Sequence, residues 1–158
     1  MARLYVGRMV DGKTFISMGV GSIKKLLAKG NPEEVVTAFN KIFLNIPYEK
    51  YPVTSESSCR MGIQLLLIGA GIYSDLEKQN ALGRSDLEFD AGDFHWVMEF
   101  KFLHKERNDN PDTLLSDALK QITERRYGEG LNIGEGRLRR VGLVFDERER
   151  QFVRYGVA

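Results

Sequence analysis

Cysteine is almost absent from this sequence, and proline and histidine are scarce. Of 158 residues, one is Cys, two are His and four are Pro. The single cysteine, Cys59, excludes an intramolecular disulfide and most cysteine-based zinc sites, a composition typical of the reducing cytoplasm. No motif pairs Cys59 with a histidine, so we expect a buried thiol in a helix and not a nucleophile.

Long apolar runs and an excess of charge of one sign are also lacking. The apolar stretch 62–72 is too short to cross a bilayer and contains Gln64, while Asp11 interrupts any signal-peptide pattern. We therefore expect no membrane association. The formal net charge of +1 excludes a strong general attraction for polyanions, so a nucleic-acid partner would require a local basic rim. The candidates for that rim are Lys101, Lys105, Arg107, Lys120, Arg125, Arg126, Arg137, Arg139 and Arg140.

The order of hydrophobic patterns and turn signals predicts an α/β protein. A hydrophobic content of 42% in 158 residues suits one domain with a substantial core. We expect an N-terminal β-hairpin extension over residues 1–20 and one domain over residues 21–158. Within that domain the patterns predict helices over 22–29, 32–46, 55–68 and 111–127, and strands near 72–78, 84–90, 94–102, 139–145 and 151–155. This order predicts a mixed β-sheet flanked by helices.

Two of the predicted strands carry polar side chains at alternate positions. From 84 to 90 the even positions are charged, and from 94 to 102 the odd positions include the polar residues. A turn over 90–93 predicts a hairpin in which facing residue numbers sum to 183, so that Asp86 faces Val97. Glu99 is then the diagonal neighbour of Asp86, about 7 Å away, and Lys101 shares the face.

Two carboxylates and a lysine on one strand face suit metal-assisted chemistry on phosphate. Hard carboxylate and carbonyl oxygens bind Mg²⁺ or Mn²⁺, which keep several waters, and an ammonium group stabilises charge on a phosphate or orients a water. Phosphodiester hydrolysis fits this set. The alternative is an amphipathic hairpin whose charged face is simply solvated. The pattern alone leaves both interpretations open.

The spacing of these residues resembles that of a known family. Asp86 followed by Glu99-Phe100-Lys101 is similar to the Asp…Glu-x-Lys signature of the PD-(D/E)XK nuclease superfamily, with Ser85 in place of the proline. The stretches 46–48, 55–57 and 118–127 resemble the nuclease-like domain at the C-terminus of many bacterial and archaeal AAA-ATPase-like proteins. The similarity extends from about Ile23 to Val153.

The resemblance implies a restriction-endonuclease-like fold and a set of site residues. Asp86, Glu99 and the backbone carbonyl of Phe100 would hold Mg²⁺ or Mn²⁺, and Lys101 would be the catalytic lysine. Glu56 would be an early helical acid near the metal and a further candidate ligand, and Gln121 a supporting polar residue. Each of the last two has a simpler interpretation, Glu56 as a companion of the helix cap and Gln121 as part of an exposed polar stripe.

The activity that the resemblance implies is divalent-metal-dependent hydrolysis of phosphodiester bonds, with DNA favoured over RNA as the substrate. An AAA-type ATPase domain would usually precede residue 1, and many members of the superfamily act as homodimers. The resemblance also leaves a second function open. The chain would then be a catalytically idle module of the same fold that binds nucleic acid or a protein partner alongside an ATPase.

Residues 7–14 match the phosphate-binding P-loop pattern and provide a third alternative, nucleotide binding. A P-loop must open a helix at its Lys-Thr end. Here the following residues are β-branched and interrupted by glycine. The Asp11-Gly12 turn of a hairpin explains the pattern more simply.

Overall fold

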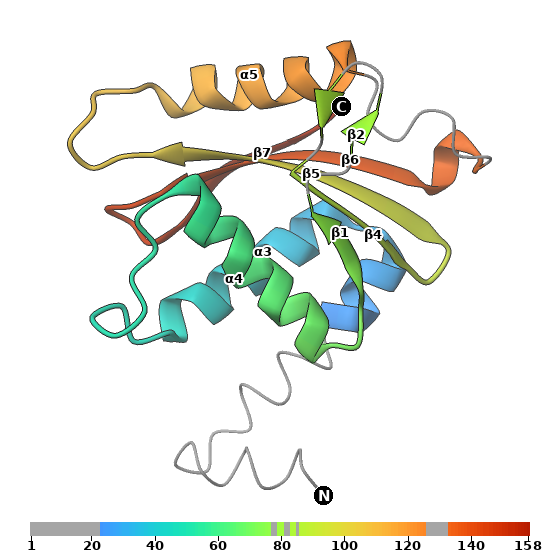
Figure 1. Cartoon of the computed structure of the whole chain (residues 1–158), viewed down its shortest axis with the longest axis horizontal. Helices are drawn as coiled ribbons and strands as arrows, with labels where there is room; N and C mark the ends of the chain where they lie inside the picture. Colours follow the sequence, from blue (N-terminus) through green and yellow to red (C-terminus); the bar gives the residue numbers. More distant parts are fainter. Residues whose placement is uncertain (1–22, 77–78, 81–82, 85, 126–132) are drawn as a thin grey trace, which may run out of the picture.

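A five-stranded mixed sheet forms the centre of the computed structural model, which describes residues 23–76, 79–80, 83–84, 86–125 and 133–158 (Figure 1). The strand order is β1-β4-β5-β6-β7, and β5 and β6 are parallel while the other pairs are antiparallel. The strands are β1 (Ser74–Leu76), β4 (Leu87–Ala91), β5 (Phe94–Leu103), β6 (Leu138–Asp146) and β7 (Gln151–Val157). A separate two-stranded ribbon consists of β2 (Gln79–Asn80) and β3 (Gly83–Arg84). The predicted α/β class is confirmed.

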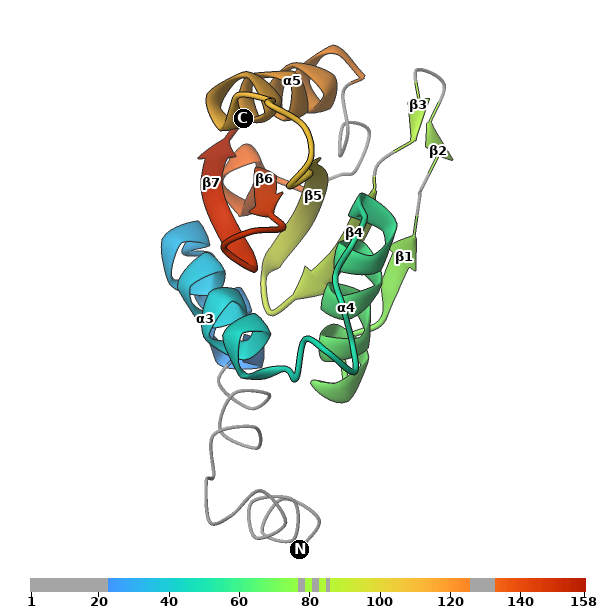
Figure 2. The same ribbon diagram turned by 90° about the vertical axis from the view of Figure 1, so that its left-hand side faces the viewer.

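Helices cover both faces of the sheet. Helices α3 (Pro32–Asn45) and α4 (Glu56–Gly69) lie on one face, and α5 (Pro111–Glu124) lies on the other (Figures 1 and 2). Residues 23–29 are also helical, and a 3₁₀ turn, η1 (Glu135–Arg137), precedes β6. None of the described helices is long and apolar enough to cross a membrane.

The three long helices begin where their capping residues predict. Asn31 accepts hydrogen bonds from the backbone N–H groups of Glu33 and Glu34, and Asn110 accepts one from Asp112. A proline occupies the first position of both helices, where a missing N–H costs nothing. Ser55 forms a capping box with Ser58 at the start of α4. Local sequence therefore fixes the position of α4, which carries two residues of the site described below.

The main core lies between the sheet and helices α3 and α4. Its aromatic centre consists of Phe39, Phe43, Phe100, Phe145 and Phe152, whose rings pack edge-on or tilted against one another. Cys59 is buried in α4 as predicted, and burial raises the pKa of its thiol.

Two glycines allow α5 to approach the opposite face of the sheet closely. A Cβ at Gly142 of β6 would lie 3.1 Å from Ala118 Cβ, and one at Gly156 of β7 would lie 2.9 Å from Leu119 Cδ1. Val97 and Ile122 are fully buried between β5 and α5. The odd-numbered face of β5 is therefore covered by a helix, and the interpretation of this face as simply solvated is wrong.

The turn of the β4–β5 hairpin lies one residue later than predicted, and this changes the pairing register. Asp90 pairs with His95 and Glu88 with Val97, so facing residue numbers sum to 185 and not to 183. Gly92, with a φ of 58°, takes the first of the two loop positions, where a hairpin turn requires a positive φ. The predicted pairing of Asp86 with Val97 is wrong. A shift of two in the sum keeps every side chain on its predicted face and brings Asp86 closer to Glu99.

Some predictions fall outside the described residues. They are the N-terminal hairpin over 1–20, the P-loop-like segment 7–14, the position of Ser85, and the end of the helix predicted to reach residue 127. Within the described residues that helix, α5, extends to Glu124.

Candidate metal centre

Asp86 lies immediately before β4, at the point where the β4–β5 pairing ends. Because β4 begins at Leu87, which pairs with Met98, the backbone of β5 beyond Met98 is not paired with β4. The Asp86 carboxylate takes the place of a β4 backbone partner at Phe100. Its Oδ2 accepts a hydrogen bond of 2.9 Å from the N–H of Phe100, and its Oδ1 accepts one of 3.0 Å from Arg60 Nη1. The backbone of β5 thus fixes the orientation of the carboxylate.

Glu99 points from β5 towards the α5 side and is 1% exposed. Its Oε1 lies 3.7 Å from Lys101 Nζ, while its Oε2 is buried and has no hydrogen-bond partner among the described residues. Burial, followed by the negative charge of Asp86, raises the pKa of Glu99 to about 8. A buried carboxylate oxygen without a partner is costly, and a bound cation would satisfy it.

The backbone carbonyl of Phe100 faces the same edge as Asp86. In a β-strand the N–H and the C=O of one residue point to the same side. The N–H of Phe100 donates to Asp86, so the carbonyl of Phe100 also points towards the unpaired edge of β5. Asp86, Glu99 and Phe100 therefore offer oxygen atoms of the kind that Mg²⁺ and Mn²⁺ prefer.

Lys101 is held by helix α5. Its Nζ donates a hydrogen bond of 3.1 Å to Gln121 Oε1. This contact depends on the close approach of α5 to the sheet at Gly142 and Gly156. Lys101 is two residues beyond Glu99 on the same face of β5, and the structure brings Lys101, Glu99 and Gln121 together as the sequence predicted.

Glu56 is the first residue of α4 and lies half-buried beside this group. Burial raises the pKa of Glu56 and the charge of Asp86 raises it further, while Lys101 and Arg60 lower it. Within the part of the chain that the structure describes, no three His, Cys, Asp or Glu side chains are grouped closely enough to hold a metal ion. The role of Glu56 as a further ligand stays a prediction.

Arg60 is a site residue that the sequence analysis missed. It follows Glu56 by one turn of α4, and the i, i+4 spacing of an acid and a base was the signal that would have found it. The side chains of Arg60 and Asp86 are 17% and 13% exposed, so their ion pair is only partly screened by solvent. Arg60 neutralises Asp86 in a site that is otherwise rich in carboxylates.

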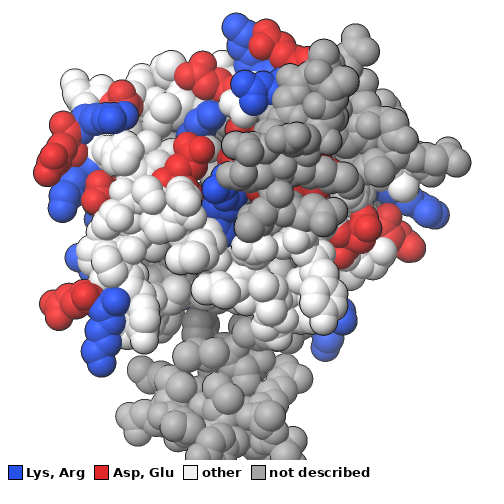
Figure 3. Space-filling view, viewed as in Figure 1, with Lys and Arg blue, Asp and Glu red and all other residues white. Residues whose placement is uncertain are grey.

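One face of the molecule has mixed charge. On the face seen in Figure 3, acidic and basic side chains of the described residues are interspersed, and they form no continuous basic area there. This agrees with the formal net charge of +1.

A family model described as the PD-(D/E)XK nuclease superfamily matches residues 54–155, more than half of the chain. The chain belongs to this superfamily. No curated protein and no solved structure gives a significant match. In this PD-(D/E)XK protein the matched region extends from just before α4 into β7 and contains all six predicted site residues. Members of the superfamily are generally phosphodiester hydrolases, and they typically use divalent metals.

Replacing Glu99 with Gln is expected to stabilise this PD-(D/E)XK domain when no metal is present. Glutamine has almost the same shape and removes a buried carboxylate whose Oε2 has no partner among the described residues. We expect a gain of about 1 kcal/mol, which corresponds to roughly 2–4 °C in Tm for a chain of this size. Thermal unfolding in EDTA measures it, with Glu149→Gln in the exposed β6–β7 turn as the control. A lower Tm for Glu99→Gln would contradict the claim that the buried Glu99 carboxylate destabilises the metal-free fold.

Proposed function

We propose that this chain is a divalent-metal-dependent nuclease that hydrolyses phosphodiester bonds, with DNA as its preferred substrate. One observation carries the proposal: the buried Glu99 carboxylate, with Oε2 unpartnered among the described residues, lies beside Asp86 and Lys101 at an unpaired strand edge. Membership of the nuclease superfamily supports it.

Asp86, Glu99 and the carbonyl of Phe100 would hold Mg²⁺ or Mn²⁺. When bound, such an ion neutralises charge that develops on the phosphate and makes water more acidic. The residues present fit the ion, because two carboxylates and a carbonyl leave positions for waters, as Mg²⁺ requires. The ion would also satisfy Glu99 Oε2.

Lys101 would orient the attacking water or stabilise the negative charge on a phosphate oxygen. An ammonium group has three N–H donors. One of them is used for Gln121 Oε1, and the amine also lies near Glu99 Oε1. We infer that Gln121 is a positioning residue, because it holds the amine beside the carboxylates. Glu56, the first residue of α4, would be a further ligand of the ion.

The ion pair between Arg60 and Asp86 favours a second candidate function. It satisfies the Asp86 carboxylate without any metal, as a catalytically idle module would require. Such a module would bind nucleic acid or a partner beside an ATPase. From the single cysteine we further propose a cytoplasmic protein. From the resemblance we propose that it works with an AAA-type ATPase, and that it forms a homodimer when both strands of a duplex are cut.

Replacing Arg60 with Gln is expected to strengthen metal binding. A metal ion that binds Asp86 Oδ1 has to displace the Arg60 guanidinium, which donates to that atom at 3.0 Å. A hydrogen bond between charged groups contributes about 1.5–3 kcal/mol, so we expect an increase in Mn²⁺ affinity of about tenfold or more. Calorimetric titration with Mn²⁺ measures it. Arg154→Gln, which removes an exposed arginine paired with Asp112, should leave the affinity unchanged. Weaker Mn²⁺ binding by Arg60→Gln would show that Arg60 supports the site and does not compete for it.

The proposed activity is tested by incubating the protein with end-labelled single- and double-stranded DNA and RNA. Mg²⁺ and Mn²⁺ are compared with EDTA. We expect metal-dependent cleavage, with DNA cut faster than RNA. Metal binding without cleavage of any of the four substrates would favour the idle module.

A further inference from the structure

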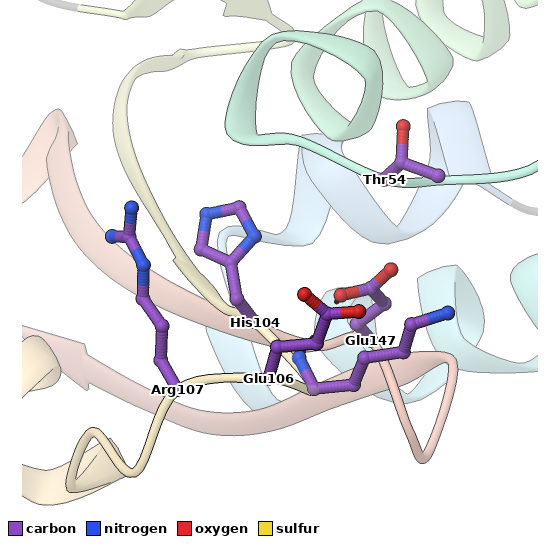
Figure 4. Close-up of a pocket in the computed structure, with 6 residues that line it drawn as sticks. Thr54, His104, Glu106, Arg107 and Glu147 are labelled. Carbon is purple, nitrogen blue, oxygen red and sulfur yellow. Dashed lines mark hydrogen bonds between the residues drawn. The ribbon is translucent and has the colours of Figure 1, made fainter.

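A second polar site lies at the end of β5, next to the candidate metal centre. It is a pocket of about 450 Å³, within the size range of small-ligand sites (Figure 4). It is lined by Thr54, His104, Lys105, Glu106, Arg107 and Glu147. Most of these residues belong to the loop that follows β5, and Thr54 belongs to the segment that leads into α4.

The loop that forms the pocket is fixed by hydrogen bonds to the β6–β7 turn. The N–H of Lys105 donates to Glu147 Oε2 at 3.0 Å, and the N–H of Glu147 donates to the carbonyl of Leu103 at 3.1 Å. Arg148 donates to the carbonyl of Lys105, and the N–H of Arg107 donates to the carbonyl of His104. Glu147 is therefore used to hold the loop. The backbone of the pocket is arranged before any ligand binds, which lowers the entropic cost of binding.

The pocket adjoins the candidate metal centre along the chain. His104 follows Lys101 by three residues, and Thr54 precedes Glu56 by two, so both segments that line the pocket continue into the metal centre. The His104 ring packs edge-on against Phe102, with ring centroids 4.8 Å apart, and Phe102 is buried. This contact restricts the position of the imidazole at the wall of the pocket.

Basic and acidic side chains both line the pocket. In Figure 4 the side chains of His104 and Arg107 extend from the loop in the same direction, while the acidic pair consists of Glu106 and Glu147. A phosphate is attracted to the first pair and repelled by the second. The guanidinium of Arg107 offers paired N–H donors that match phosphate oxygens, and imidazole adds another donor. Carboxylates accept hydrogen bonds from the amino groups of bases.

We propose that this pocket binds the nucleotide that flanks the cleaved bond, with Arg107 and His104 on its phosphate and Glu106 towards its base. The proposal rests on the proposed nuclease function and assigns the pocket to the nucleic-acid strand. One nucleotide in the pocket places the next phosphate of the strand towards Glu56 and Lys101. Arg107 and His104 then determine substrate binding and leave the chemical step to the metal centre.

The first test compares Arg107→Gln and His104→Gln with Arg154→Gln as a charge-matched control. Arg107 is exposed, so its replacement should leave the fold intact. With Mg²⁺, we expect KM for a short DNA strand to rise about tenfold in each pocket variant, while kcat changes less than about twofold. Binding of the strand by fluorescence anisotropy in EDTA should weaken similarly in the pocket variants, and the slope of log K against log salt should decrease by about 0.7 for Arg107→Gln. Arg154→Gln should match the wild type in every measurement.

A second test locates the phosphate. Single uncharged methylphosphonate linkages are placed at successive positions of the strand, and binding is measured for wild type and Arg107→Gln. A methylphosphonate at one position beside the cleavage site should weaken wild-type binding about tenfold. It should have little effect on binding by Arg107→Gln, because this variant has already lost the arginine that contacts that phosphate. A free deoxynucleoside monophosphate should compete with the strand only at much higher concentration. Competition at equal concentration would assign the pocket to a free nucleotide and overturn the proposal.

The failure of this inference is distinguishable from failure of the nuclease function. If the wild type cleaves DNA and the pocket variants have unchanged KM and binding, the pocket assignment alone is wrong. A fall in kcat at constant KM would instead place Arg107 in the chemical step and would also overturn it. A wild type that binds and cleaves no nucleic acid overturns both.

Discussion

Replacing Asp86 with Asn is expected to lower the rate of metal-dependent cleavage on the order of 1,000-fold or more. The amide keeps one oxygen for the N–H of Phe100, so the local fold should be retained. It removes the negative charge that would hold the ion and leaves Glu99 as the only carboxylate of the proposed ligand set. Without the ion, the charge that develops on the phosphate loses its main stabilisation. Single-turnover cleavage with saturating enzyme measures the rate.

Asp93→Asn provides the control for this experiment, because Asp93 lies exposed in the turn of the same hairpin. It removes an equal charge from the region and should change the rate less than about twofold, since exposed carboxylates are largely screened. A decrease in rate of less than about tenfold for Asp86→Asn would show that Asp86 serves mainly as the ion-pair partner of Arg60.

Replacing Lys101 with Met is expected to decrease kcat by about 100- to 1,000-fold while Mn²⁺ binding is retained. Methionine fills similar volume and cannot donate to water, phosphate or Gln121. Removal of one group that stabilises charge in a transition state typically costs this much. The removal of a cation 3.7 Å from Glu99 Oε1 also makes the site more negative, so Mn²⁺ affinity should stay the same or rise.

The matched control for Lys101 is Lys120→Met on α5. Lys120 is exposed and paired with Glu124, one turn away on the same helix. It should leave kcat unchanged. Gln121→Ala should give a smaller decrease than Lys101→Met, because it frees the amine but does not remove it. Equal kcat values for Lys101→Met and wild type would exclude Lys101 from the reaction.

Much of the fold could be predicted because the signals that define it are local. Capping side chains at Asn31, Ser55 and Asn110 fix the starts of three helices, and each is complete within a few residues of sequence. The alternation along β5 likewise assigned Glu99 and Lys101 to one face, and a period of two makes this independent of the exact turn. The spacing in the hairpin was therefore sufficient to place Asp86 and Glu99 on the same face and near each other, although the predicted pairing was wrong.

One error was local. The two-residue turn at Gly92 set the hairpin register, and the prediction placed that turn one residue too early. The remaining features depend on contacts between segments that are distant in sequence. Arg60 reaches Asp86, just before β4, from helix α4, and the spacing of Glu56 and Arg60 on that helix does not indicate this contact. The same holds for the pocket, where Glu147 of the β6–β7 turn fixes the loop after β5. Such pairings follow from the packing of α4 and β7 around the sheet, which no single segment determines.

The measurement that tests the central claim most directly is a calorimetric titration of Mn²⁺ into the wild type, Asp86→Asn and the control Asp93→Asn. The metal centre proposed here predicts one ion per chain at the Asp86–Glu99 edge in the wild type and in Asp93→Asn, and an affinity at least about tenfold lower in Asp86→Asn. The absence of binding in the wild type, or equal binding by Asp86→Asn, would contradict the assignment of this edge as the metal centre of a nuclease.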